Sequence, residues 1–207
     1  MLLGNIVLGF AIGDFNGQLQ QVRLAQQRLA ALERAGERGR SQGELIAQRA
    51  RLKTLSQQFQ VLRQRKELHF LFGLAGSLVT VLVNSITVTY FIGTSRWCRE
   101  VVDRYGLDNS LALQSNQLKR KSFPWALVGI SVMLAIIVLG AAADPSANME
   151  NAIAWVMPHY LSAIVGTGLV ALSFWVQVGN IGMNYEVIEQ ILSEVRRIRA
   201  ERGLDSD

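Results

Sequence analysis

The sequence predicts an all-α integral membrane protein with three transmembrane helices, an N-terminal helical (coiled-coil-like) hairpin and a C-terminal amphipathic helix. The first observation is that the 74 residues between Lys121 and Arg196 contain no Lys or Arg, in a chain with 21 basic residues. The second is that three apolar runs, at 68–93, 123–143 and 159–183, are each long enough to cross a bilayer. A bilayer excludes cations, whereas a soluble domain distributes them over its surface, so both observations indicate a membrane.

The first element, residues 1–15, is expected to be a short apolar helix. No Lys or Arg precedes its apolar stretch, so it does not resemble a secretory signal sequence. About 20 apolar residues are needed to cross the hydrocarbon core, and this segment is shorter. We therefore expect an interfacial or half-buried helix, with a short uncleaved anchor as the alternative.

The second element, residues 16–67, is expected to be a basic, Gln-rich helical hairpin. Two runs of heptad-spaced apolar residues flank a break that has three glycines between Gly36 and Gly43. The heptad positions are Val22, Ala25, Leu29 and Leu32 in the first run and Leu45, Leu52, Leu55, Phe59 and Leu62 in the second. About two heptads per helix give marginal stability in isolation, so we expect the hairpin to need a partner.

The first span is assigned to residues 68–95, of which 70–92 carry no charged side chain. We expect the second hairpin helix to run into this span without a break and to cross the membrane once. The alternative is a re-entrant loop that enters and leaves on one side, for which Asn84-Ser85 is the only candidate turn. Residues 96–122 are then expected to form a basic polar loop with short helices.

Those short helices are expected on either side of Gly106, with Asp108 or Ser110 as the N-cap of the second. Residues 123–183 form a hairpin of two spans, opened by Pro124.

Pro124 is expected at the first position of its helix, where the missing proline amide costs nothing. The last element, residues 184–207, is expected to be an amphipathic C-terminal helix and tail. Apolar residues follow one stripe from Ile188 to Ile198, and four arginines cluster near its end.

The distribution of Lys and Arg orients the hairpin of two spans. By the positive-inside rule, Lys119–Lys121 and the C-terminal arginines are cytoplasmic, and the acidic loop 144–158 is outside. The expected location is therefore integral to a membrane, the plasma (inner) membrane, with a cytoplasmic C-terminus. A single crossing of 70–92 places the basic hairpin outside, against the rule, because residues 14–67 carry 11 Lys/Arg and 5 Asp/Glu.

One face of the first span is small and polar. Its members lie three or four residues apart, which places them on one side of a helix: Gly73, Ser77, Thr80, Asn84 and Thr87. Such a face either packs against other helices or lines a pore. Packing is the simpler interpretation, because no ionisable group accompanies the face.

A second group of residues suggests contacts with anionic lipid headgroups. These are the basic residues that flank the spans: Arg63, Arg65, Lys66, Lys119, Arg120 and Lys121. The basic hairpin lacks aromatic residues for stacking on bases and adjoins a membrane, so we do not expect nucleic acid as a partner.

The sequence contains no pattern that indicates catalysis, a metal site or a cofactor. No Asp, Glu, Lys or Arg lies inside a span, which argues against a proton pump. We expect His69 and His159 to lie at opposite bilayer surfaces, too far apart to ligate one haem iron. Cys98 is expected to be an ordinary interfacial thiol rather than a reactive or palmitoylated one.

Together these patterns predict a non-enzymatic structural or assembly subunit of an oligomeric membrane complex. We expect it to associate with itself or with other subunits through small-residue faces of the spans and short helical seams. The alternative is an ion or small-solute channel lined by the polar face of the first span.

Overall fold

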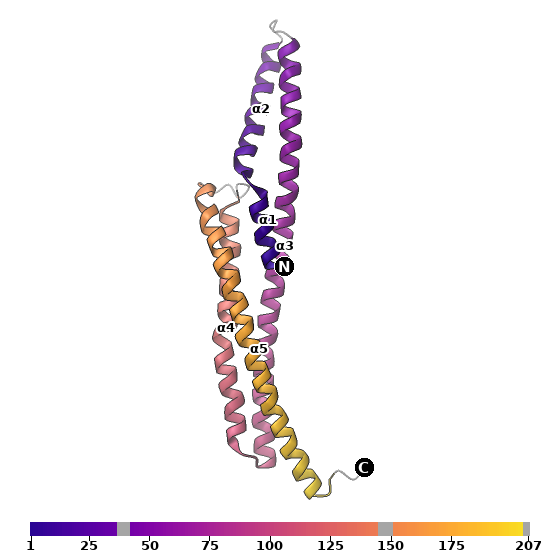
Figure 1. Ribbon diagram of the computed structural model, residues 1–207, viewed down its shortest axis with the longest axis vertical. Helices are drawn as coiled ribbons and strands as arrows, with labels where there is room; N and C mark the ends of the chain where they lie inside the picture. The colour runs from indigo at the N-terminus through magenta and orange to yellow at the C-terminus, as the bar shows by residue number, and fades with distance from the viewer. Residues whose placement is uncertain (37–41, 145–150, 205–207) are drawn as a thin grey trace. The chain divides into compact units, whose positions relative to one another are not determined.

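A computed structural model describes residues 1–36, 42–144 and 151–204, and these residues form helices and no strand. In chain order the helices are α1 (Leu2–Ile12), α2 (Phe15–Gly36), α3 (Gln42–Tyr105), α4 (Asn109–Ala142), the 3₁₀ helix η2 (Ala152–Trp155) and α5 (Val156–Glu201) (Figure 1). The all-α prediction is therefore confirmed for the described part of the chain. Most of the glycine-rich turn and residues 145–150 of the loop lie outside the described residues.

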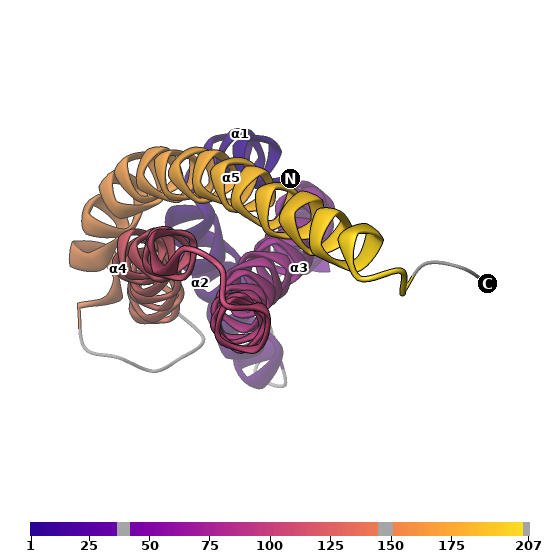
Figure 2. The same ribbon diagram turned by 90° about the horizontal axis from the view of Figure 1, so that it is seen from below.

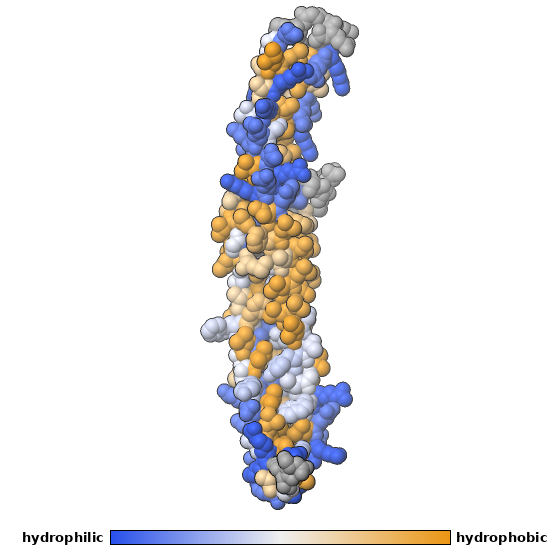
Figure 3. Space-filling model, turned by 90° about the vertical axis from the view of Figure 1, so that its right-hand side faces the viewer, coloured by the Kyte–Doolittle hydropathy of each residue, from blue (hydrophilic) through white to orange (hydrophobic). Residues whose placement is uncertain are grey.

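Three helical stretches are long and apolar enough to cross a membrane: Gln42–Tyr105, Asn109–Ala142 and Ala152–Glu201. Large hydrophobic side chains remain exposed along them, as expected for surfaces that face lipid. Figure 3 shows hydrophobic side chains covering these apolar stretches, and hydrophilic ones gathered over the hairpin and near the C-terminal end of the chain.

The helix α3 is continuous for 64 residues. It contains no turn at Asn84-Ser85, so a re-entrant loop is not what this sequence forms. A helix without Pro has no internal signal to stop, and α3 ends only where Gly106 takes a left-handed conformation with φ of 67°. Leu107 N–H then donates to the carbonyl of Val102 at 3.0 Å, closing the helix end.

The expected polar loop at 96–122 is instead the end of α3, a tight turn and the start of α4. Asp108 is the cap of α4, because its carboxylate accepts the backbone N–H of Ser110 at 2.9 Å and the Ser110 hydroxyl at 2.7 Å. α4 therefore begins well before the apolar run, and Pro124 lies inside it rather than at its first position. The proline leaves the carbonyl one turn earlier without its helical donor.

The helices pack as two compact units, which we describe separately. Unit 1 comprises Met1–Gly76 and Ala141–Tyr160, and unit 2 comprises Ser77–Gly140 and Leu161–Asp207.

In unit 1 the short helix α1 packs against α3. Two glycines of α3 allow this approach: a Cβ added at Gly73 would lie 3.0 Å from the Asn5 amide, and one at Gly76 would lie 2.9 Å from Leu2. One turn before Gly73, His69 Nδ1 lies 3.0 Å from the Asn5 carbonyl. The apolar N-terminal segment is thus a helix held at the start of the predicted first span.

The helix α2 also packs against α3 in unit 1. Gln48 of α3 donates to the Ala25 carbonyl at 3.2 Å, and the rings of Phe15 and Phe59 lie 5.0 Å apart. All nine predicted heptad positions are buried or half-buried, whereas most residues between them are exposed. The heptad spacing therefore identified the face along which these two helices meet.

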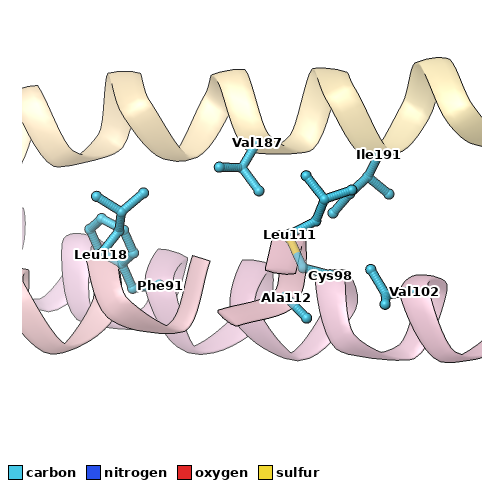
Figure 4. Close-up of a cluster of buried hydrophobic side chains, with 8 residues drawn as sticks. All are labelled: Phe91, Cys98, Val102, Leu111, Ala112, Leu118, Val187 and Ile191. Atoms are coloured by element: carbon cyan, nitrogen blue, oxygen red, sulfur yellow. The ribbon is translucent and has the colours of Figure 1, made fainter. Parts of the chain in front are cut away.

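In unit 2, segments of α3, α4 and α5 surround a common core, seen end-on in Figure 2. The hydrophobic part of this core consists of Phe91, Cys98 and Val102 of α3, Leu111, Ala112 and Leu118 of α4, and Val187 and Ile191 of α5 (Figure 4). Except for Phe91, the α3 and α4 residues of this core lie beyond the predicted end of the first span, where the polar loop was expected. The core explains why both helices extend there, since each buries one apolar stripe.

Candidate functional site

The most distinctive feature of unit 2 is a set of buried polar side chains between its three helices, which we call the polar seam. Its members are Thr80, Asn84 and Thr87 of α3, Ser115 and Ser122 of α4, and Ser173, Gln177, Asn180 and Asn184 of α5. None is more than 5% exposed. A polar group buried in an apolar environment is costly unless it is hydrogen-bonded, so the partners of these groups decide what the seam does.

Gln177 connects all three helices at one end of the seam. Its amide nitrogen donates to Asn84 Oδ1 at 2.9 Å and to Ser173 Oγ at 2.7 Å. Asn84 in turn donates to the Thr80 carbonyl at 2.8 Å, and Ser173 donates to the Trp125 carbonyl of α4 at 2.7 Å. These bonds fix the orientation of both amides, because each amide nitrogen points at oxygen atoms.

Close contact with α4 seals this end of the seam. A Cβ added at Gly129 would lie 2.9 Å from Asn84 Nδ2, so only a glycine leaves room for the Asn84 side chain. Asn84 is fully buried as a result.

Asn184 connects the three helices at the other end of the seam. Its carbonyl oxygen accepts the Ser115 hydroxyl at 2.7 Å, and its nitrogen donates to Tyr90 Oη and Thr94 Oγ1, both at 3.1 Å. Between the two ends, Asn180 donates to Ser122 Oγ at 2.9 Å. Side-chain hydrogen bonds therefore join α5 to both α3 and α4 in unit 2.

The hydrogen bonds described here join uncharged groups of neighbouring helices, as is typical of helix packing. Hydrogen bonds between transmembrane helices contribute on average about 0.6 kcal/mol each, and up to about 1.7 kcal/mol. Thr80 and Asn84 are 2% and 0% exposed, so within unit 2 the predicted polar face of the first span lies in a helix contact. Ser77 and Thr87 are buried on the same face.

Gly73, the remaining member of the predicted face, does not belong to the seam. It lies in unit 1 and faces Asn5 of α1. The face thus serves two contacts, one with α1 and one with α4 and α5.

Sequence reasoning missed the α5 half of the seam. Ser173, Gln177, Asn180 and Asn184 recur at intervals of four, three and four residues, which is the same periodicity that identified the face of the first span. Earlier in α5, Gly166 is also buried, and a Cβ there would lie 2.7 Å from Ile136 of α4.

The two histidines occupy one place in unit 1, which overturns the expectation that they lie at opposite surfaces. The ring centroids of His69 and His159 are 6.3 Å apart, with the planes at 79°. The reason is that His69 and His159 lie on two long helices, α3 and α5, whose segments around these residues pack within unit 1. α1 fills the adjoining space: a Cβ at Gly9 would lie 3.1 Å from His69 Cε1, and Tyr160 donates to the Gly9 carbonyl.

The basic residues suggested as lipid contacts differ in their surroundings. Arg63 pairs with Glu67 at 3.0 Å, and Arg65 donates to the Ala11 carbonyl at 2.8 Å. Lys66 pairs with Asp144 at 2.7 Å.

By contrast, the basic cluster on α4, which is Lys119, Arg120 and Lys121, forms no ion pair within the described part of the chain. Arg120 and Lys121 are exposed and Lys119 is half-buried. Both basic groups thus have two exposed members and one half-buried member, and they differ in that only the first forms ion pairs among the described residues.

Cys98 is fully buried in the hydrophobic core of unit 2 rather than interfacial. Burial raises the pKa of its thiol, although a hydrogen bond with Ser115 acts in the opposite direction. A reactive thiolate is therefore disfavoured.

Among the described residues, no group of three or more His, Cys, Asp or Glu side chains could hold a metal ion. The chain matches no protein-family model, no curated protein and no solved structure.

Proposed function

We propose that this chain is a non-enzymatic structural or assembly subunit of an oligomeric complex in the plasma (inner) membrane. The observation that carries the proposal is the polar seam, in which Gln177 and Asn184 of α5 form side-chain hydrogen bonds with α3 and Asn184 also bonds to α4. A protein whose polar groups hold its helices together, and whose outer surface is apolar, is suited to forming a rigid helical unit in lipid.

Association with other subunits is supported by the outer face of α5. A Cβ added at Gly168, Gly179 or Gly182 would meet no atom within 4 Å, and Trp175 on the same face is 80% exposed. Glycines that face outward let a neighbouring helix approach closely, and the tryptophan supplies contact area. We call this surface the α5 outer face. The hairpin of α2 and α3 offers a second, coiled-coil-like contact.

Two contacts in unit 1 support the proposed membrane orientation. Lys66 pairs with Asp144, and His69 lies beside His159, so the hairpin and the 144–158 loop share one side of the membrane. The positive-inside rule applies to residues within about 20 positions of a span. On that basis six Lys/Arg precede the first span, at 48–67, whereas ten lie on the opposite side. The rule therefore favours a cytoplasmic C-terminus, because the more distant charges of the hairpin are not counted.

Purification in mild detergent tests the proposal. The wild-type chain is expected to resist carbonate extraction and to elute as an oligomer. The variant Gly179→Leu, which places a bulky side chain on the α5 outer face, is expected to shift the protein toward the monomer. A wild-type monomer with a disordered hairpin would contradict the proposal.

The channel alternative predicts that the polar face of the first span contacts water. Recording in planar bilayers separates the two functions. The assembly function predicts no conductance above that of protein-free membranes. A conductance that Asn84→Leu abolishes would establish the channel instead.

A further inference from the structure

Unit 2 contains an apolar groove between α3 and α5 with a volume of about 680 Å³. Its floor and one wall are seven residues of α3 between Ser85 and Trp97, and the other wall is Ile188 and Leu192 of α5. This volume is within the range of roughly 300–1,000 Å³ that is typical of small-molecule sites. We propose that the groove binds one acyl chain of an anionic phospholipid, whose phosphate lies at the arginines beyond Trp97.

The floor of the groove is open because its side chains are small. Ser85, Thr89 and Gly93 follow one another at four-residue intervals along α3. A Cβ added at Gly93 would meet no atom within 4 Å, so the space above this residue is vacant. The hydroxyls of Ser85 and Thr89 donate to α3 carbonyls at 2.8 Å and 2.9 Å, and those of Tyr90 and Thr94 accept from Asn184. These hydroxyls therefore have partners within unit 2, and the groove presents an apolar surface.

The length of the groove favours a lipid chain over a helix of another protein. Twelve residue steps from Ser85 to Trp97 span about 18 Å at 1.5 Å per residue. One leaflet of a bilayer contributes about 15 Å, half of the hydrocarbon core of about 30 Å. The lining of the groove does not extend beyond Ser85 to Leu82 and Leu78, whose large side chains are 58% and 64% exposed. A spanning helix needs a contact surface of about twice this length.

The charges beyond the groove match a lipid headgroup. Trp97 lies at the end of the groove where the uncharged part of α3 ends, as is typical of an interfacial tryptophan. Arg104 follows two turns later on the same face of α3, and Arg199 follows two turns after Leu192 on α5. Arg104 makes none of the ion pairs found among the described residues. The acidic residue on this face, Glu100, pairs with Arg96 at 2.8 Å.

The inference rests on the proposed function, since a chain outside the membrane would meet no lipid chain. The test is native mass spectrometry of protein delipidated in detergent and titrated with phosphatidylglycerol or phosphatidylcholine. Gly93→Leu fills the groove and is expected to lower the fraction carrying one phosphatidylglycerol at least about fivefold. Gly179→Leu is the matched control, because the same substitution is made on the opposite side of α5.

The four results are distinguishable. Two observations together support both the groove and the proposed function. Gly93→Leu loses the lipid and keeps the oligomer, and Gly179→Leu loses the oligomer and keeps the lipid. Equal lipid binding by Gly93→Leu and wild type overturns the groove alone. Loss of the oligomer from Gly93→Leu also overturns it, because the groove is then a protein contact. A wild-type monomer that retains the lipid overturns the assembly function and leaves the groove in place.

The headgroup has its own test in the same titration. Arg104→Gln is expected to remove most of the preference for phosphatidylglycerol over phosphatidylcholine. It should leave phosphatidylcholine binding within about twofold of wild type. An unchanged preference would overturn the assignment of the phosphate to this end of the groove.

Discussion

The hydrogen bond between Ser115 and Asn184 tests the polar seam quantitatively. Asn184 is fully buried and makes three side-chain hydrogen bonds, at 2.7, 3.1 and 3.1 Å. At about 0.6 kcal/mol for each bond, Asn184→Ala should lower the free energy of unfolding by about 2 kcal/mol, and the small cavity adds to this. The assay is unfolding in mixed detergent micelles, followed by circular dichroism. Gln190→Ala, at an exposed position of the same helix, is the control and should cost less than about 0.5 kcal/mol.

A double-mutant cycle isolates the bond itself. Ser115→Ala and Asn184→Ala are measured alone and together, and the pair should be coupled by about 0.6–1.7 kcal/mol. Coupling no larger than the additivity error of about 0.3–0.5 kcal/mol would refute the reasoning. In that case the side chains would be neighbours without holding the helices together.

Three further predictions concern other parts of unit 2. Cys98 should react with maleimides only after unfolding, because burial protects the thiol and raises its pKa; rapid labelling of the folded protein would show that the core is open. Two hydrogen bonds lower the pKa of Asp108, the larger effect coming from the Ser110 hydroxyl and the smaller from the Ser110 backbone N–H. The ionised cap therefore stabilises α4 at pH values above the ordinary carboxyl pKa of about 4, and this stabilisation is lost as the pH falls below that value. Asp108→Asn should weaken this pH dependence of unfolding, and an identical acid profile would exclude the cap as its source. Gly166→Val should destabilise the folded protein by about 1–3 kcal/mol through overpacking against Ile136; stability equal to wild type would contradict the close crossing of α4 and α5.

Helix existence and the packing faces were predictable from spacing. The heptad positions in α2 and α3 and the row Ser77, Thr80, Asn84 and Thr87 are the buried sides of their helices, because a 3.6-residue period places such residues together. The row Ser173, Gln177, Asn180 and Asn184 of α5 follows the same period, but its polar residues are diluted in a long apolar run and stand out less.

Boundaries and long-range contacts were not predictable in the same way. Residues 96–122 contain enough charge to be read as a loop, yet Cys98 and Val102 lie on the apolar stripe that buries the end of α3. The meeting of His69 and His159 depends on how many times the chain crosses, which no local pattern determines. Which helices contact which is a property of the assembled bundle rather than of any one segment.

The central claim, that each of three helices crosses the membrane once, is tested most directly by cysteine accessibility. In a Cys98→Ser background, single cysteines replace three exposed residues: Thr54 in the hairpin, Ala154 beside the loop and Ser193 near the C-terminus. Membrane-impermeant maleimide on oriented membranes should label positions 54 and 154 from the outer side and position 193 only from the cytoplasmic side. Labelling of 54 and 193 from the same side would contradict the account.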